Sequence, residues 1–144
     1  MKNVKINIHE LGPIKDASIL LAPFMIFTGQ SNLGKSYVNF LSYYVFDFFG
    51  NNRLNRFLSP KVEGKPWKSN SISFSFSLDD LRSFMSNDVQ VFMRDMLAHN
   101  GLICSVSFDF EESIAQKFNI VVKKVDAKAF DDTDPDLSFN EIRN

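Results

Sequence analysis

Residues 29–36 have the types and spacing of a loop that holds phosphate groups. Their sequence, GQSNLGKS, fits the pattern G-x-x-x-x-G-K-[ST]. In that pattern the two glycines allow backbone N–H groups to point at phosphate oxygens, in conformations that a Cβ would block. The ammonium group of Lys35 then reaches the β- and γ-phosphates, and the hydroxyl of Ser36 binds Mg²⁺. The pattern therefore predicts a nucleotide-binding loop.

The residues on either side of the loop fit this interpretation. The short apolar run 24–28 follows a break at Pro23 and predicts a β-strand that ends at the loop. Residues 37–49 predict a helix whose positive N-terminal end faces the bound anion. Ser36 is the candidate metal ligand, and the candidate nucleotide-binding residues are Gly29, Gln30, Ser31, Asn32, Leu33, Gly34, Lys35, Ser36 and Tyr37.

The rest of the chain predicts an α/β fold with an antiparallel β-element. Strands are predicted over 3–9, 17–21, 71–76, 103–110 and 118–125. Apolar and polar residues alternate with the period of a strand over 3–9, 71–76 and 103–110. A turn at Gly12-Pro13 would return the second strand antiparallel to the first.

Two further regions connect these strands. A helix is predicted over 81–97, because apolar residues recur there at helical spacing and an S-x-x-D capping signature at 77–80 precedes them. Ser86 would also cap well, so a split into two helices stays open. Residues 51–70 are polar and rich in Pro and Gly, which predicts an exposed connection with a short helical turn at 54–58.

Composition limits the class of protein. The 144 residues suffice for one domain or part of a larger protein, and sixteen Phe predict an aromatic core. The net charge of −1 gives no overall basic field that would favour nucleic acid. The single cysteine, Cys104, is predicted to be a buried thiol in a reducing cytosol. Without a signal peptide or an apolar run of ~20 residues, we expect a cytoplasmic protein with no membrane partner.

The predicted organisation is one lobe followed by a tail. Residues 1–125 form the expected nucleotide-binding lobe, with strands, loop and helix at 1–50 and a β/α element at 71–125. Acidic residues dominate 126–144, which predicts an acidic tail or the cut edge of a longer chain.

The first third of the chain resembles the opening of ABC-type P-loop ATPases of the SMC, RecF and OLD group, often described as AAA family ATPases. Those proteins often begin with a strand, a G-P-I-K-x-A turn, a second strand and a P-loop that ends in G-K-S. Here the turn reads GPIKDA at 12–17. Leu33 departs from the small polar residue frequent in the group, and Tyr37 departs from the frequent Thr. Neither change removes a phosphate contact.

The resemblance implies the N-terminal lobe of a P-loop NTPase, in which a strand of a parallel sheet feeds the loop. It implies that Mg-ATP binds between two heads, and that engagement of the heads gates action on DNA in repair or phage defence. The partner would be a second ATPase head or the remainder of a longer chain. In the group the first hairpin approaches adenine and ribose, which makes Ile14 and Lys15 candidate contacts.

The parts that the group uses for hydrolysis are not recognisable in this sequence. A Walker B strand is an apolar run that ends in Asp-Glu within a parallel sheet. The nearest stretch, 106–112, alternates like an antiparallel strand, and 120–126 is interrupted by two lysines. No L-S-G-G-Q-like signature occurs, and Gln90 and Gln116 stand in polar surroundings. We therefore expect hydrolysis to need segments beyond residue 144 or on another chain, and catalytic residues stay unassigned.

Other chemistries have weaker support. His9 and His99 lie far apart with no second metal-ligand cluster, and Met85, Met93 and Met96 recur at the spacing of a helix core.

Two alternatives to the ATPase lobe stay open. A small-molecule phosphotransferase could use the same loop, although its arginines would need to gather in a lid. A non-catalytic interaction module could dock a partner through aromatic surfaces.

Overall fold

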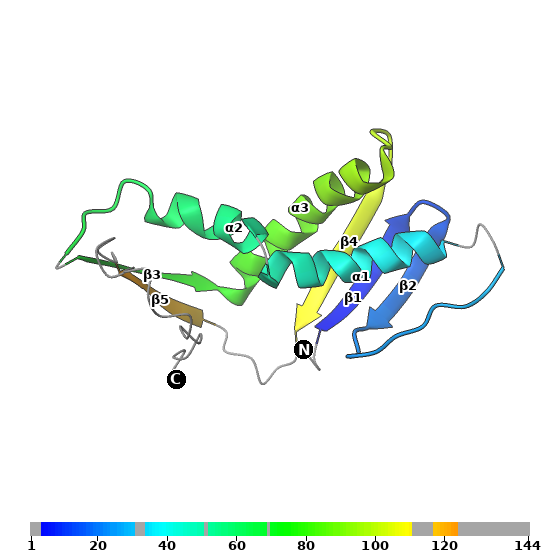
Figure 1. Ribbon diagram of the computed structural model, residues 1–144, viewed down its shortest axis with the longest axis horizontal. Coiled ribbons are helices and arrows are strands. Elements are labelled where there is room, and N and C mark those ends of the chain that lie inside the picture. Colours follow the sequence, from blue (N-terminus) through cyan, green and yellow to red (C-terminus); the bar gives the residue numbers. More distant parts are fainter. Residues whose placement is uncertain (1–3, 31–33, 51, 69, 111–116, 124–144) are drawn as a thin grey trace, which may run out of the picture.

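The computed structural model describes residues 4–30, 34–50, 52–68, 70–110 and 117–123. The acidic stretch 126–144 lies outside these ranges. Within them the chain is a small α/β fold with two antiparallel sheets and three helices (Figure 1). The elements in chain order are β1 (Val4–Leu11), β2 (Ile14–Leu20), α1 (Lys35–Gly50), α2 (Asn52–Val62), β3 (Ser71–Ser77), α3 (Leu78–Leu97), β4 (Cys104–Phe110) and β5 (Lys117–Lys123).

The larger sheet has the strand order β2-β1-β4, with β1 at its centre. β1 and β2 form the antiparallel hairpin that the turn at 12–13 predicts. β4, far along the chain, pairs antiparallel with the other edge of β1. Ile6 lies opposite Phe108 in this pairing, and both side chains are fully buried on the same face. The sheet therefore has one apolar face and one polar face.

Helices α1 and α3 pack against the apolar face of this sheet (Figure 1). The ring of Tyr44 on α1 lies at the centre of the core. Its centroid is 5.7 Å from that of Phe108 on β4 and 5.3 Å from that of Phe92 on α3. Such tilted ring pairs are the favourable geometry for packed aromatic side chains. The predicted aromatic core is confirmed.

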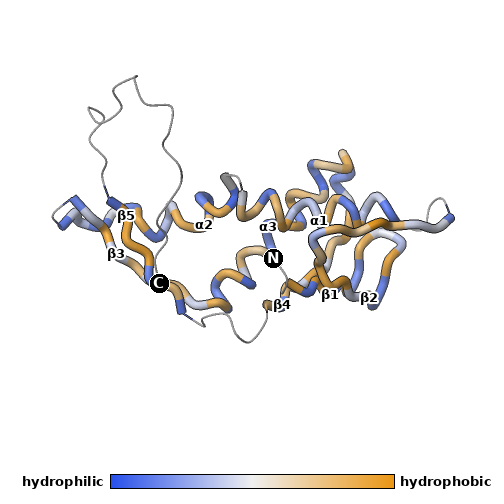
Figure 2. Tube along the Cα trace, turned by 60° about the horizontal axis from the view of Figure 1, so that its bottom comes forward, coloured by the Kyte–Doolittle hydropathy of each residue, from blue (hydrophilic) through white to orange (hydrophobic). Residues whose placement is uncertain are grey.

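A second unit, which we call the arm, consists of residues 52–77 and 117–123; the other described residues form the body. Figures 1 and 2 show the arm extending to one side of the body, with the loop between α2 and β3 at its far end. β3 and β5 pair antiparallel along their whole length. Their apolar face packs on α2, where the ring of Phe57 lies 5.0 Å from that of Phe76.

Helix α3 joins the arm to the body without interruption. The Ser77 hydroxyl accepts a hydrogen bond from the Asp80 N–H at 3.0 Å, and the Asp80 carboxylate accepts one from the Ser77 N–H at 2.9 Å. These bonds confirm the predicted capping box, and they hold the pKa of Asp80 below its usual range. The split at Ser86 is wrong, because Met85 and Val89 continue one buried face past it.

Residues 24–28 do not form the strand predicted to feed the loop. They adopt irregular structure, and both sheets of the described chain are antiparallel. Met25 and Phe27 are half-buried, whereas Phe24 and Ile26 are 79% and 70% exposed. A strand requires hydrogen bonds to a neighbouring strand, which β-propensity alone cannot supply. The predictions of a strand at 24–28 and of a parallel sheet are therefore wrong for the described residues.

The connection 51–70 is more ordered than its composition predicts. In place of a short turn at 54–58, it contains the eleven-residue helix α2, with Pro60 near its end. Phe57 on this helix is buried between Phe76 and Phe84. Packing of the Phe57 side chain thus stabilises a helix that the polar sequence of this segment does not predict.

The helices α1 and α3 expose some side chains that the sequence assigns to the core. Tyr43 and Phe46 on α1 are about half exposed, and so is Met96 on α3, whereas Met85 and Met93 are buried as predicted. None of the described helices is both long and apolar enough to cross a membrane.

We predict that Cys104 is almost inert toward thiol reagents in the folded chain. Its side chain is buried at the start of β4, and this burial raises the pKa of the thiol to about 11. At pH 8 the thiolate fraction should be about 100-fold lower than that of an unperturbed cysteine. The rate at which a chromogenic disulfide modifies Cys104 measures this protection. In denaturant the protection should disappear and the rate should rise to that of an unperturbed cysteine. Equal rates in native and denatured protein would contradict the burial.

Candidate functional site

Residues 29–36 include the N-terminus of α1. The helix begins at Lys35, and the carbonyl of Gly34 accepts its first hydrogen bond from the N–H of Val38 at 3.0 Å. Gly29 and Gln30 lie before this point in irregular structure. Ser31, Asn32 and Leu33 lie outside the described residues. The helix thus starts at the lysine of the motif, as phosphate binding at a helix N-terminus requires.

The side chain of Lys35 folds back over the beginning of the loop. Its Nζ atom donates hydrogen bonds to the carbonyl oxygens of Gly29, at 2.8 Å, and Gln30, at 2.5 Å. The two ends of the loop are therefore joined through one ammonium group. A phosphate oxygen could replace these carbonyls, because the ammonium has three donors and no acceptor.

Gly34 occupies a position that an amino acid with a side chain could not take without strain. Its φ angle is +89°, in the left-handed region. A Cβ at this residue would lie 2.6 Å from Cγ1 and 2.7 Å from Cδ1 of Ile14. The β1–β2 hairpin therefore packs directly against the end of the loop.

A second contact holds the hairpin against α1. The ring of Tyr37 lies on Gly12, where an added Cβ would be 2.8 Å from the ring atom Cε1. Gly12 has a φ angle of +56°, as the hairpin turn requires. Ile14 is thus brought to the loop, whereas Lys15 forms an exposed ion pair with Glu10 at 3.4 Å. Contact of Ile14 or Lys15 with a nucleotide stays a prediction.

The electrostatic surroundings of the loop favour an anion. The first turn of α1 carries Lys35 and no acidic residue. The unpaired N–H groups at the start of a helix carry partial positive charge, which adds to the field of the ammonium. Ser36 is exposed in this turn, so its hydroxyl is accessible to a metal ion. The arrangement places positive charge and hydrogen-bond donors where a phosphate group would need them.

The structure does not bring an acidic side chain of β4 to the loop. β4 is an antiparallel strand, as its alternation predicts. Asp109 lies on its polar face and accepts a hydrogen bond from Asn7 at 2.6 Å. Glu111, Glu112 and Gln116 lie outside the described residues. Within the described ranges no three His, Cys, Asp or Glu side chains gather as a metal site.

Sequence reasoning missed a partly buried ionic cluster where the three helices meet. The Nε of Arg53 lies 2.6 Å from Oδ2 of Asp47, and its Nη1 lies 2.9 Å from Oδ2 of Asp88. The hydroxyl of Tyr44 also contacts Asp88 at 3.2 Å, and Arg53 lies over the ring of Phe92. Side-chain exposure is 7% for Asp88 and 18% for Arg53.

Burial and charge shift two groups of this cluster. Burial, followed by the charge of Asp88, raises the pKa of Tyr44 far above its usual range. Burial opposes the charge of Arg53, but hydrogen bonds to Asp88 and Asp47 outweigh it and raise its pKa. Arg53 therefore stays charged and Tyr44 stays neutral at ordinary pH, and the contacts of the cluster connect α2 to α1 and α3. No periodic signal in the sequence predicts it.

Comparisons of this chain with protein-family models, with curated proteins and with solved structures give no match.

Proposed function

We propose that this chain binds Mg-ATP through residues 29–36, as the nucleotide-binding lobe of an ABC-type ATPase similar to SMC, RecF and OLD-like proteins. The observation that supports this most directly is the position of Lys35. It begins α1, and its ammonium group closes the loop over the carbonyls of Gly29 and Gln30. A glycine at φ +89° precedes it, as in a loop whose backbone N–H groups point at a ligand.

The residues present fit ATP and Mg²⁺. Lys35 would bind the β- and γ-phosphates, and the N–H groups at the start of α1 would bind the same anion. Ser36 would hold Mg²⁺ together with phosphate oxygens and water, and proteins usually add one or two carboxylates to such a site. When bound, Mg²⁺ would neutralise phosphate charge.

The described residues would bind the nucleotide but not hydrolyse it. Asp109, the nearest counterpart of a Walker B carboxylate, lies on the polar face of an antiparallel strand. We propose that a second head or another segment of the protein supplies the missing carboxylate and signature loop. Action on DNA in repair or defence would belong to the complete assembly.

We predict that replacing Lys35 by alanine weakens binding of a fluorescent ATP analogue about 10- to 100-fold. The substitution removes the charge-assisted hydrogen bonds to the phosphates, each worth about 1.5–3 kcal/mol. The measurement is a titration with Mg²⁺ present, followed by fluorescence anisotropy. The matched control is Lys5→Ala on β1, which removes the same exposed charge from another part of the body.

Other outcomes would favour the alternatives. Equal affinity for the chain and Lys35→Ala would contradict the proposed loop. Nucleotide-independent self-association in sedimentation would support a non-catalytic interaction module. Release of ADP stimulated by a small acceptor would support a phosphotransferase.

A further inference from the structure

Positive charge is concentrated in the arm, although the chain as a whole is slightly acidic. The arm carries one carboxylate, Glu63, against seven basic side chains: Arg53, Arg56, Lys61, Lys65, Lys68, Lys117 and Lys123. The described body carries the opposite balance, with five basic and eight acidic side chains. Residues far apart in the sequence, from α2 to β5, thus give the arm an excess of positive charge. The net charge of −1 does not reveal it.

The basic side chains differ in what they contact. Arg53 and Arg56, at the base of the arm, lie near Asp88 at 2.9 and 3.6 Å. The five lysines farther out have no carboxylate within ion-pair distance among the described residues. The Nζ atoms of Lys61 and Lys65 lie 4.7 and 5.3 Å from the ring centroids of Phe57 and Phe74, contacts that leave their charge unneutralised. The charge of these lysines can therefore attract an external anion.

The outer face of the β3–β5 ribbon carries hydrogen-bond donors and no acidic group. β3 reads SISFSFS, and its apolar residues are buried, so the serines form the other face. Across the ribbon, Ser71 pairs with Lys123, and Ser77 pairs with Lys117. Asn119 lies on the same face between them, opposite Ser75. Lys, Ser and Asn side chains are common phosphate-binding groups in protein–nucleic acid contacts.

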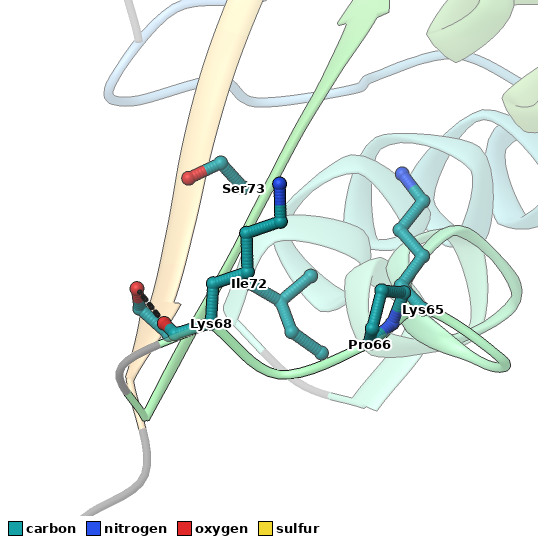
Figure 3. A pocket seen from close by; sticks show the side chains of 6 residues that line it. Lys65, Pro66, Lys68, Ile72 and Ser73 are labelled. Carbon is teal, nitrogen blue, oxygen red and sulfur yellow. Dashed lines mark hydrogen bonds between the residues drawn. The ribbon is translucent and has the colours of Figure 1, made fainter.

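A cavity of about 260 Å³ lies at the start of β3. Figure 3 shows Lys65 and Lys68 extending side by side, with Ile72 between them. Ser71 and Ser73 belong both to the cavity lining and to the serine face of the ribbon. Trp67, between the two lysines in the sequence, is 41% exposed. Lysines and an exposed aromatic ring therefore occur together at the tip of the arm.

We propose that the tip of the arm binds the phosphodiester backbone of a nucleic acid, with Lys65, Lys68 and Lys123 as phosphate contacts. Charge complementarity supports this partner, because the surface is basic, lacks described carboxylates on the ribbon, and adds neutral donors. A two-stranded ribbon also fits the major groove of B-DNA, and an exposed Trp can stack on an unpaired base. The inference does not depend on nucleotide binding at the P-loop.

The test uses labelled single-stranded DNA, duplex DNA and RNA of one sequence, each titrated with the full chain at several salt concentrations. Binding is expected to fall steeply with salt. Lys65→Gln combined with Lys68→Gln should weaken it about tenfold and reduce the log–log salt slope by about two. Lys5→Gln and Lys35→Ala should leave affinity for nucleic acid unchanged, and the double variant should leave ATP-analogue binding unchanged. These controls separate this proposal from that of the P-loop.

The sole tryptophan reports the place of binding. Trp67 fluorescence should be quenched by the nucleic acid that binds. Quenching by single strands alone would identify stacking on bases, and equal affinity for duplexes would identify backbone contacts. Salt-independent binding, unchanged affinity in the double variant, or an equal loss in Lys5→Gln would overturn the proposal. So would poly-L-glutamate binding as tightly as DNA, which would identify an acidic protein as the partner.

Discussion

Replacement of Gly34 by alanine is expected to lower the free energy of unfolding by about 3 kcal/mol and to prevent nucleotide binding. An L-residue at a φ of +89° is strained by about 1–2 kcal/mol, and overpacking typically adds about 1–3 kcal/mol. The added Cβ would lie 2.6 Å from Cγ1 of Ile14, so the hairpin or the loop must move. Denaturant unfolding measures the stability, and the fluorescent ATP analogue measures binding.

Gly50→Ala is the matched control at the other end of α1. An added Cβ there meets nothing within 4 Å, so this variant should be neutral or slightly more stable. Adding Ile14→Ala to Gly34→Ala removes the clash but not the backbone strain, and should restore nucleotide binding in part. A Gly34→Ala chain with normal stability and affinity would show that the loop does not adopt this geometry.

Replacement of Asp88 by alanine is expected to destabilise the chain by about 3 kcal/mol and lower its melting temperature by roughly 10 °C. The substitution leaves Arg53 with Asp47 as its carboxylate partner and removes the acceptor of the Tyr44 hydroxyl. Removing one partner of a buried pair leaves a charge that water cannot fully solvate. Thermal unfolding followed by circular dichroism measures the effect.

Two variants distinguish loss of this cluster from loss of any carboxylate on α3. Asp95→Ala, at an exposed position of the same helix, should change stability by less than about 0.5 kcal/mol. Arg53→Met should cost less stability in the Asp88→Ala background than in the unchanged chain, because Asp88 is then no longer left without its partner. An additive loss in the double variant would contradict the coupling of the two residues.

Much of the candidate site follows from the sequence, because its determinants are local. The start of α1 at Lys35 and the turn at residues 12–13 depend on glycine and on helix-terminal chemistry, which short patterns express. The contact of Ile14 with Gly34 is different. It joins a hairpin to a helix through tertiary packing, and no local pattern contains its distance.

The fold was less predictable wherever one segment needs a distant partner. Residues 24–28 have the composition of a strand, but composition cannot provide the neighbouring strand that pairing requires. The pairing of β4 with β1 joins segments about a hundred residues apart, and alternation cannot specify it. Residues 52–62 show the opposite error, because their polar, proline-containing sequence predicts a loop and the structure has a helix. Phe57 packs against Phe76 of β3 and so stabilises this helix.

Helix α3 determines how much change in length the molecule tolerates between its two sheets. It begins directly after β3 and spans twenty residues, or about 30 Å, before the short connection to β4. Each residue inserted in it would turn the ribbon by about 100° around the helix axis, so a single insertion would move the arm to another side of the body. An insertion of about seven residues, close to two whole turns, would nearly restore the direction. Changes in length are therefore expected in the loop between α2 and β3, where they alter no angle between the sheets.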